Sequence, residues 1–125
     1  MTIDDYEIKN KLGEGAFGKV YMCIDRKTNK EVAVKMLSKI FLAKTGKVQS
    51  VFRERNILMN SCDCNFIPEI YHTFADAENL YIVMEFMSGG TMQEKLKLVT
   101  LTGFKKDMVR FYTAQIVIAL GYLQL

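Results

Sequence analysis

The sequence contains the stretch Leu12-Gly13-Glu14-Gly15-Ala16-Phe17-Gly18-Lys19-Val20, in which the glycines are spaced Gly-x-Gly-x-x-Gly. Such spacing occurs in dinucleotide-binding folds, in phosphate-binding hairpins and in ordinary flexible turns. A dinucleotide site requires a helix directly after the glycines, whereas Gly18 is followed by residues 19–24, which are rich in strand formers. The stretch therefore predicts the tip of a β-hairpin. The tip is either an ordinary turn or one whose backbone N–H groups lie over a triphosphate.

Outside this stretch, the apolar pattern predicts an α+β fold. The expected strands are Tyr6–Leu12, Lys19–Asp25, Glu31–Leu37, Asn65–Phe74 and Leu80–Glu85. The expected helices are Val48–Met59, Thr91–Leu98 and Lys106–Leu125. Ser88-Gly89-Gly90 breaks the chain after the fifth strand. We therefore expect two parts: residues 1–90 with five strands and one main helix, and residues 91–125 with two further helices.

Lys35 ends the apolar run Val32-Ala33-Val34 within the third strand. An ammonium among apolar neighbours is costly unless it has partners, and phosphate oxygens and a carboxylate would both serve. Glu54 supplies a carboxylate on the same helix face as Val51 and Leu58, three and four residues away. Each residue could instead lie in water: Lys35 at a strand end and Glu54 in a solvated charged run. Together with the glycine stretch, however, they indicate a phosphate site.

Composition points to a soluble globular protein without a nucleic-acid or membrane partner. The 125 residues carry 17 Lys plus Arg against 14 Asp plus Glu, a mild net charge of +3. No secretory signal is visible at the N-terminus and no run is long enough to span a membrane, so a cytoplasmic location is expected. Three cysteines do not form a disulfide framework. A Cys62-Asp63-Cys64 metal hook is disfavoured because no second pair follows, and no metal site is expected.

The stretch Leu12–Val20, followed by Val32-Ala33-Val34-Lys35, resembles the nucleotide-binding signature of eukaryotic protein kinases. The resemblance covers essentially the whole chain. The segments 54–58, 79–87, 89–90 and 110–117 resemble in particular the serine/threonine kinases of the AGC group, which includes the cyclic-nucleotide-dependent kinases. The implied fold is a protein-kinase N-lobe, with a five-stranded antiparallel sheet and one main helix, followed by the first helices of an incomplete helical C-lobe.

The resemblance implies ATP as the cofactor and assigns roles to individual residues. Lys35 would hold the α- and β-phosphates, with Glu54 as its ion-pair partner. Val20 and Ala33 would enclose the adenine, and Met84 would be the gatekeeper at the back of the pocket. The remaining implied residues are Leu12, Gly13, Glu14, Gly15, Ala16, Phe17, Gly18 and Lys19 in the glycine stretch, Glu85 and Met87 at the adenine edge, and Leu58 and Ile70 in an apolar column linking the lobes.

Two features depart from the cyclic-nucleotide-dependent kinases. Thr91 stands where those kinases carry a glutamate after the paired glycines, and Glu94 follows three residues later. The 125 residues also contain no His-Arg-Asp or Asp-Phe-Gly motif, which in the family carry the catalytic base and a Mg²⁺ ligand. Mg²⁺ is expected for a whole kinase, but its ligands are absent from this chain, which alone is expected to be inactive.

Two functions from different classes therefore remain open. The first is the ATP-binding portion of a serine/threonine kinase, whose full-length form would transfer the γ-phosphate to protein hydroxyls. The second is a free-standing ATP-binding or pseudokinase-like regulatory module. The AGC resemblance further implies a docking groove for a C-terminal tail near Val51 and Leu80.

Overall fold

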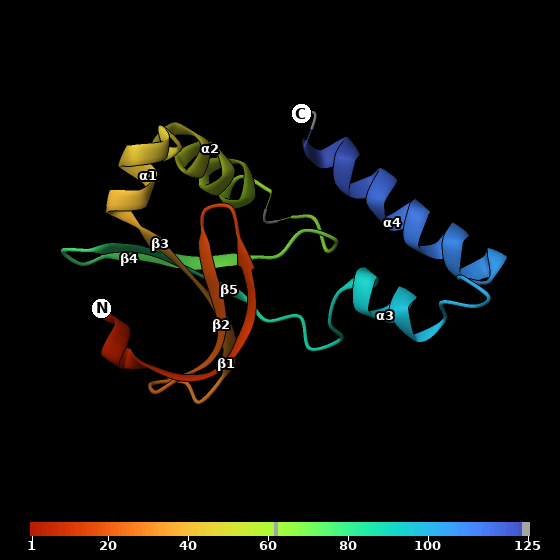
Figure 1. The fold of residues 1–125 in the computed structure, drawn as a ribbon, viewed down its shortest axis with the longest axis horizontal. Coiled ribbons are helices and arrows are strands. Elements are labelled where there is room, and N and C mark those ends of the chain that lie inside the picture. Colours follow the sequence, from red (N-terminus) through yellow and green to blue (C-terminus); the bar gives the residue numbers. More distant parts are fainter. Residues whose placement is uncertain (62, 124–125) are drawn as a thin grey trace.

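The computed structural model describes residues 1–61 and 63–123. Five strands form one antiparallel sheet in the order β1-β2-β3-β5-β4 (Figure 1). The strands are β1 (Tyr6–Gly15), β2 (Gly18–Asp25), β3 (Glu31–Ser38), β4 (Ile70–Ala75) and β5 (Asn79–Glu85). The helices are α1 (Lys39–Thr45), α2 (Val48–Met59), α3 (Met92–Leu98) and α4 (Lys106–Leu123), with a short 3₁₀ turn, η1 (Ile3–Asp5), before β1. This confirms the α+β, kinase-like fold expected from the sequence.

The two faces of the sheet bury different cores, because successive side chains of a strand point to opposite faces. Val32 and Val34 of β3 belong to a core that also contains Tyr6, Cys23, Tyr81 and Val83. Leu37 belongs to a second core, where it packs with Leu42 of α1 and Val51 of α2. The helices therefore cover the face that also carries Ala33 and Lys35.

The first core closes because the sheet curls until its two edges meet. Tyr6 of β1 stacks on Phe74 of β4, with ring centroids 5.9 Å apart, and Phe74 stacks on Tyr81 of β5 at 4.7 Å. The hydroxyl of Tyr6 also contacts Nε2 of His72 on β4. Burial raises the pKa of Tyr6 to about 12, because the charged phenolate would be desolvated. Aromatic contacts across the curl thus hold the outer strands together.

The glycine stretch forms a tighter hairpin than the sequence predicts. The β1–β2 ladder continues through the glycines to the pair Gly15↔Gly18, so only Ala16 and Phe17 form the turn. A Cβ on Gly18 would lie 2.0 Å from the carbonyl oxygen of Met36. Gly18 is therefore required for the close approach of the hairpin to β3.

Two elements differ from the sequence-based expectation. Helix α1 is additional to the single main helix expected in residues 1–90. Ser38 caps its first turn by accepting a hydrogen bond from the Phe41 N–H, and Gly46, with a φ of 65°, ends the helix.

The predicted strand Asn65–Phe74 is wrong at its start. The chain makes successive local turns as far as Ile67, including hydrogen bonds from Cys64 N to Ser61 O and from Ile67 N to Cys64 O. Pro68, which lacks an N–H, follows them, and β4 begins only at Ile70.

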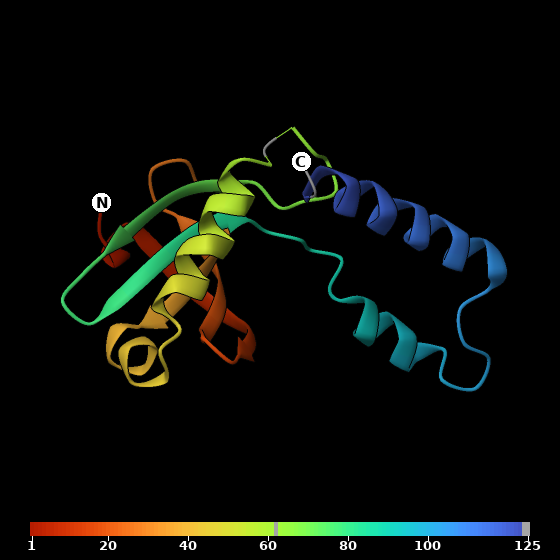
Figure 2. The ribbon, with the colours of Figure 1, turned by 90° about the horizontal axis from the view of Figure 1, so that it is seen from above.

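Helices α3 and α4 lie beside the sheet, not against it (Figures 1 and 2). Thr91 and Glu94 form a capping box that starts α3. The α4 helix ends at Leu123 in the structure, and positions 124–125 of the expected helix, like Cys62 of the disfavoured metal hook, fall outside the described residues. Large apolar side chains of α4 are exposed, among them Phe111, Val117 and Leu120. In the part of the chain that the structure describes, no helix is long and apolar enough to cross a membrane.

Candidate nucleotide site

Lys35 and Glu54 form an ion pair between the sheet and α2. The Nζ of Lys35 donates to Oε1 of Glu54 over 2.7 Å. The side chain of Lys35 is 17% exposed and that of Glu54 is 39% exposed, so the pair lies at the edge of the interior and one side remains open to solvent. Buried Val51 anchors the same face of α2 against the second core. The arrangement holds an ammonium in a fixed place where further oxygen ligands could reach it.

Val20 and Ala33 lie on the same face of the sheet as Lys35. Val20 of β2 is directly opposite Lys35 of β3, and Ala33 is opposite Met84 of β5. Directly opposed residues of an antiparallel pair share a face, and Ala33 is two positions from Lys35 along one strand. An apolar surface made of small and medium side chains therefore extends from the ion pair toward the end of β5.

A cavity of about 310 Å³ lies at the end of β5, where the chain leaves the sheet. Five of the sequence-predicted nucleotide residues line it: Leu12, Ala33, Met84, Glu85 and Met87. Six further residues complete the lining, namely Pro68, Phe86, Ser88, Gly90, Thr91 and Glu94. The sequence reasoning did not assign these six to the site. The Ser88-Gly89-Gly90 break was the available signal, because a chain reversal directly after a strand brings its flanking residues to the same edge.

The segment after β5 is held in place while one backbone donor stays open. The N–H of Glu85 donates to the Glu69 carbonyl over 2.9 Å, and the Met87 carbonyl accepts from the Gly90 N–H. Within residues 1–61 and 63–123, the Met87 N–H donates no hydrogen bond to the protein. A peptide N–H at the wall of a cavity is a hydrogen-bond donor available to a bound molecule.

Glu94 brings a carboxylate to the wall of this cavity. Its Oε2 accepts from the Thr91 N–H at 2.7 Å and from the Thr91 hydroxyl at 3.0 Å. Hydrogen bonds from the Thr91 backbone and then from its side chain lower the pKa of Glu94 below its ordinary value. The capping box therefore keeps this carboxylate ionised beside the cavity.

The glycine hairpin contributes to a different cavity in this structure. Residues 14–19 line a cavity on the opposite side of the hairpin from Ala33 and Met84. Glu14 pairs with Lys11, and the hydrogen bond from Lys11 lowers the pKa of that carboxyl. Phe17 packs on the second core. The structure thus brings the adenine-edge residues together at one cavity and pairs Lys35 with Glu54, while Glu14–Lys19 line a second cavity.

The apolar column of Leu58 and Ile70 stays a prediction. Ile70 packs on the second core, whereas Leu58 lies with Glu54 along an open cavity that Leu123 of α4 also lines. Within residues 1–61 and 63–123, no group of three His, Cys, Asp or Glu side chains is placed to hold a metal ion.

Known proteins resemble the chain over almost its full length. The family described as "Protein kinase domain" matches residues 6–124. "Probable serine/threonine protein kinase IREH1" of Arabidopsis thaliana is 37% identical over 122 residues, which cover 98% of this chain and 9% of that protein. "Serine/threonine-protein kinase sgk-1" of Caenorhabditis elegans is 35% identical over 98% of this chain and 26% of its own length.

A third relative belongs to the same set: "Serine/threonine-protein kinase akt-1" of C. elegans is 33% identical over 98% of this chain and 22% of its own length. The chain thus spans from about a tenth to a quarter of the curated relatives it matches. The family match over residues 6–124, on a fold that joins a strand lysine to a helix glutamate, establishes that this chain belongs to the protein kinase domain family.

Proposed function

We propose that this chain is the ATP-binding portion of a serine/threonine protein kinase. The observation that carries the proposal is the 2.7 Å ion pair between Lys35 and Glu54. A lysine held in this way keeps its charge at a fixed point between sheet and helix, which suits the binding of phosphate oxygens. The three relatives above are named as serine/threonine protein kinases, which supports protein hydroxyls as the acceptors.

The cavity at the end of β5 suits the adenine ring. Met84 closes its inner wall, and Ala33 and Leu12 supply apolar surface for a flat base. The Met87 N–H and the Glu85 carbonyl would bond the adenine edge, and Val20 would cover the ring from the hairpin side. ATP supplies the γ-phosphoryl group, and the contribution of this chain is to bind and orient the nucleotide.

The glycine hairpin would lie over the phosphates, with backbone N–H groups of Gly13–Gly18 as donors. Gly13 and Gly15 have open space where a Cβ would lie, so the backbone can be approached closely at these positions. The residues proposed to bind ATP are therefore Leu12, Gly13, Glu14, Gly15, Ala16, Phe17, Gly18, Lys19, Val20, Ala33, Lys35, Met84, Glu85 and Met87.

The proposal assigns two parts to the chain and no catalysis to it alone. Residues 1–90 would form the N-lobe and end in the hinge, and residues 91–125 would form the first two helices of a C-lobe. Mg²⁺ would accompany ATP in the whole kinase, and we assign it no ligand here. Because the sequence lacks a His-Arg-Asp or Asp-Phe-Gly motif, these 125 residues would bind nucleotide without transferring phosphate.

A tail-docking groove beside α2 completes the proposal. A cavity of about 220 Å³ is lined by Val51, Phe52 and Arg55 of α2 and by Leu80 of β5, among others. Its apolar walls suit aromatic side chains, and the resemblance to the AGC group names a C-terminal aromatic segment as the occupant. A cytoplasmic location is consistent with the free thiols of Cys23 and Cys64.

Titration calorimetry of ATP into the 125-residue chain, paired with a radiolabelled transfer assay on a protein substrate, tests the proposal. We expect saturable ATP binding and no transfer of phosphate. Absence of ATP binding by the folded chain would contradict the nucleotide site. Transfer of phosphate by the chain would contradict its assignment as a binding portion alone.

A further inference from the structure

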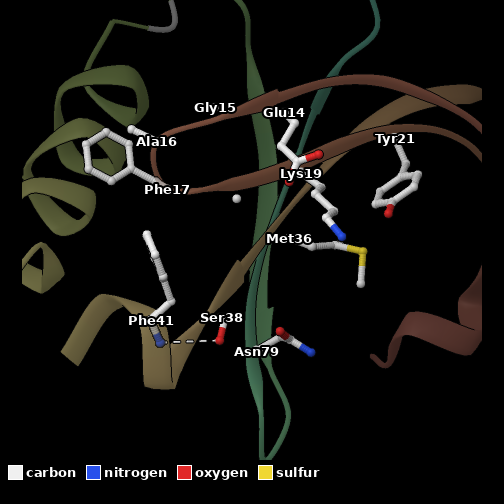
Figure 3. A pocket seen from close by; sticks show the side chains of 11 residues that line it. Glu14, Gly15, Ala16, Phe17, Lys19, Tyr21, Met36, Ser38, Phe41 and Asn79 are labelled. Carbon is white, nitrogen blue, oxygen red and sulfur yellow. Dashed lines mark hydrogen bonds between the residues drawn. The ribbon is translucent and has the colours of Figure 1, made fainter. Parts of the chain in front are cut away.

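A second cavity lies behind the glycine hairpin and beside α1, and the β-strand residues that line it are on the face of the sheet away from Lys35. It encloses about 390 Å³ and is lined by Lys19 and Tyr21 of β2, Met36 and Ser38 of β3, Phe41 of α1, and the hairpin tip (Figure 3). Met36 and Ser38 alternate with Lys35 and Leu37 along β3, so they point to the opposite face. The cavity therefore lies mainly across the sheet from Lys35, although its hairpin residues 14–19 also belong to the proposed nucleotide site.

The cavity is the open mouth of the curled sheet. Tyr21 and Met36, which line it, pack at their other side against the core that Tyr6 and Tyr81 close. Mouths of curled or closed sheets are common places for small-molecule sites, and a volume of about 300–1,000 Å³ is typical of them. A cavity of this size fits a compact ligand but is too small for a folded partner.

Aromatic side chains form one wall of the cavity. Phe41 extends from the first turn of α1 toward Phe17 at the hairpin tip (Figure 3). Ser38 fixes that turn, because its Oγ accepts the Phe41 N–H over 3.4 Å. The wall therefore offers two rings from rigid elements and, with Met36 and Tyr21 opposite, suits a flat apolar ligand.

Lys19 and Glu14 are the two charged side chains of the cavity lining. The Glu14 carboxylate, which also lines it, is paired with Lys11. Across the described ranges Lys19 itself forms no ion pair, although its charge contributes to the lowered pKa of Glu14, and in Figure 3 its side chain ends beside Met36. Ser38 and Asn79 at the opposite end add neutral polar groups. A cation that forms no ion pair, in a cavity lined by three aromatic rings, favours an anion on an apolar body.

We propose that this cavity is a second ligand site, which binds a small planar aromatic carboxylate with its ring between Phe41 and Met36 and its carboxylate on Lys19. The occupant is a small molecule, because a cavity of about 390 Å³ with Lys19, Ser38 and Asn79 in its lining offers a compact anion all its polar contacts at once. The site shares Glu14–Lys19 with the proposed ATP site, but ATP would use backbone N–H groups of the hairpin, whereas this site uses the side chain of Lys19.

The probe is 2-naphthoate, titrated into the 125-residue chain by calorimetry. An efficient ligand of this size should bind with a dissociation constant of about 1 mM or tighter. Lys19→Gln should weaken binding about fivefold, because it removes one partly exposed charge-assisted hydrogen bond. Phe41→Ala should weaken binding by a similar factor. Lys44→Gln, an exposed lysine elsewhere on α1, serves as the matched control and should bind like wild type.

Two further measurements on the wild-type protein test the charge contact and the location of the site, so that a folding defect of a variant cannot explain the result. Neutral 2-naphthamide tests the charge contact in the wild-type protein. It should bind wild type as weakly as 2-naphthoate binds Lys19→Gln. Saturating ATP, whose own binding is measured in the same experiment, should not displace 2-naphthoate. The proposal is overturned if wild type shows no saturable binding, if neither Lys19→Gln nor Phe41→Ala changes it, or if ATP displaces the probe. A chain that fails to bind ATP yet binds the naphthoate would refute the proposed function and not this site.

Discussion

Lys35 and Glu54 are 19 residues apart in sequence, yet the Lys35 ammonium lies 2.7 Å from the Glu54 carboxylate. Neither element alone explains the contact. The alternation of β3 turns Lys35 toward the helical face, and the anchoring of Val51 in the second core turns the Glu54 face of α2 inward. The pair is thus positioned by the packing of α2 on the sheet, so its geometry reports how these two elements dock.

Glu54→Gln should weaken ATP binding while leaving the fold intact. Glutamine keeps the size of the side chain but removes the charge that orients Lys35, and the pair is partly solvated, so we expect a loss of about three- to tenfold in affinity. Calorimetric titration measures the loss. Glu31→Gln, at an exposed position of β3, is the control. Equal affinities for wild type and Glu54→Gln would remove Glu54 from the site.

Met84→Gly should enlarge the inner wall of the cavity at the end of β5. Met84 lies opposite Ala33 across the β3–β5 ladder, so loss of its side chain opens space behind the base. Adenine nucleotides enlarged at the exocyclic amine should then bind the variant and not wild type, while ADP binds both. Met84→Ala gives the same test with less loss of strand stability. Identical selectivity of the variants and wild type, measured by competition, would place the adenine elsewhere.

Leu80→Glu should abolish docking of an aromatic tail in the groove beside α2. Leu80 lines the groove together with Val51, and a carboxylate there would have to be desolvated by the incoming ring. A peptide carrying two phenylalanines, titrated by fluorescence anisotropy, should bind wild type. It should also bind Ile40→Glu, a charge introduced at an exposed position outside the groove. No binding to wild type, or unchanged binding to Leu80→Glu, would count against the groove.

Gly18→Ala should destabilise the chain by about 1–3 kcal/mol, because the added methyl group meets the Met36 carbonyl oxygen at 2.0 Å. Gly13→Ala is the matched control, since nothing lies within 4 Å of its new Cβ. Urea unfolding monitored by circular dichroism gives both free energies of unfolding. If Gly18→Ala proves as stable as Gly13→Ala, the hairpin does not approach β3 as closely as the structure has it.

The sequence predicts the elements whose signals are local. Strand formers on both sides of the glycines predict β1 and β2, and the spacing of Val51, Glu54 and Leu58 predicts α2 together with its inward face. The sequence does not predict α1, because a helix of seven residues with one buried side chain, Leu42, is too short to show a helical repeat of apolar residues. The late start of β4 escapes it because the turns before Pro68 bury Cys64 and Ile67, whose apolar character imitates a strand.

The residues of the candidate site also fall into those that the sequence predicts and those that it does not. Lys35 and Glu54 follow from motif and spacing, and the assignments of Met84, Glu85 and Met87 follow from the resemblance to the kinase family. Thr91 and Glu94 reach the same cavity only through the positive φ of 73° at Gly90 and the capping box that follows. Gly89-Gly90 and the spacing of Thr91 and Glu94 are local signals of that reversal, but they do not indicate the cavity that it borders. The cavity behind the hairpin is equally invisible in the sequence, because it arises from the curl of the whole sheet.

A comparison of ATP with adenosine tests the central claim most directly, since only ATP can use the charge of Lys35. In wild type, ATP should bind more tightly than adenosine. Lys35→Met should weaken ATP binding about tenfold or more and leave adenosine binding within about twofold, because the hinge contacts are untouched. Lys30→Met, at an exposed lysine before β3, should change neither. The account would be contradicted if the Lys35→Met variant bound ATP as tightly as wild type. It would also be contradicted if the folded variant lost affinity for adenosine and for ATP by the same factor.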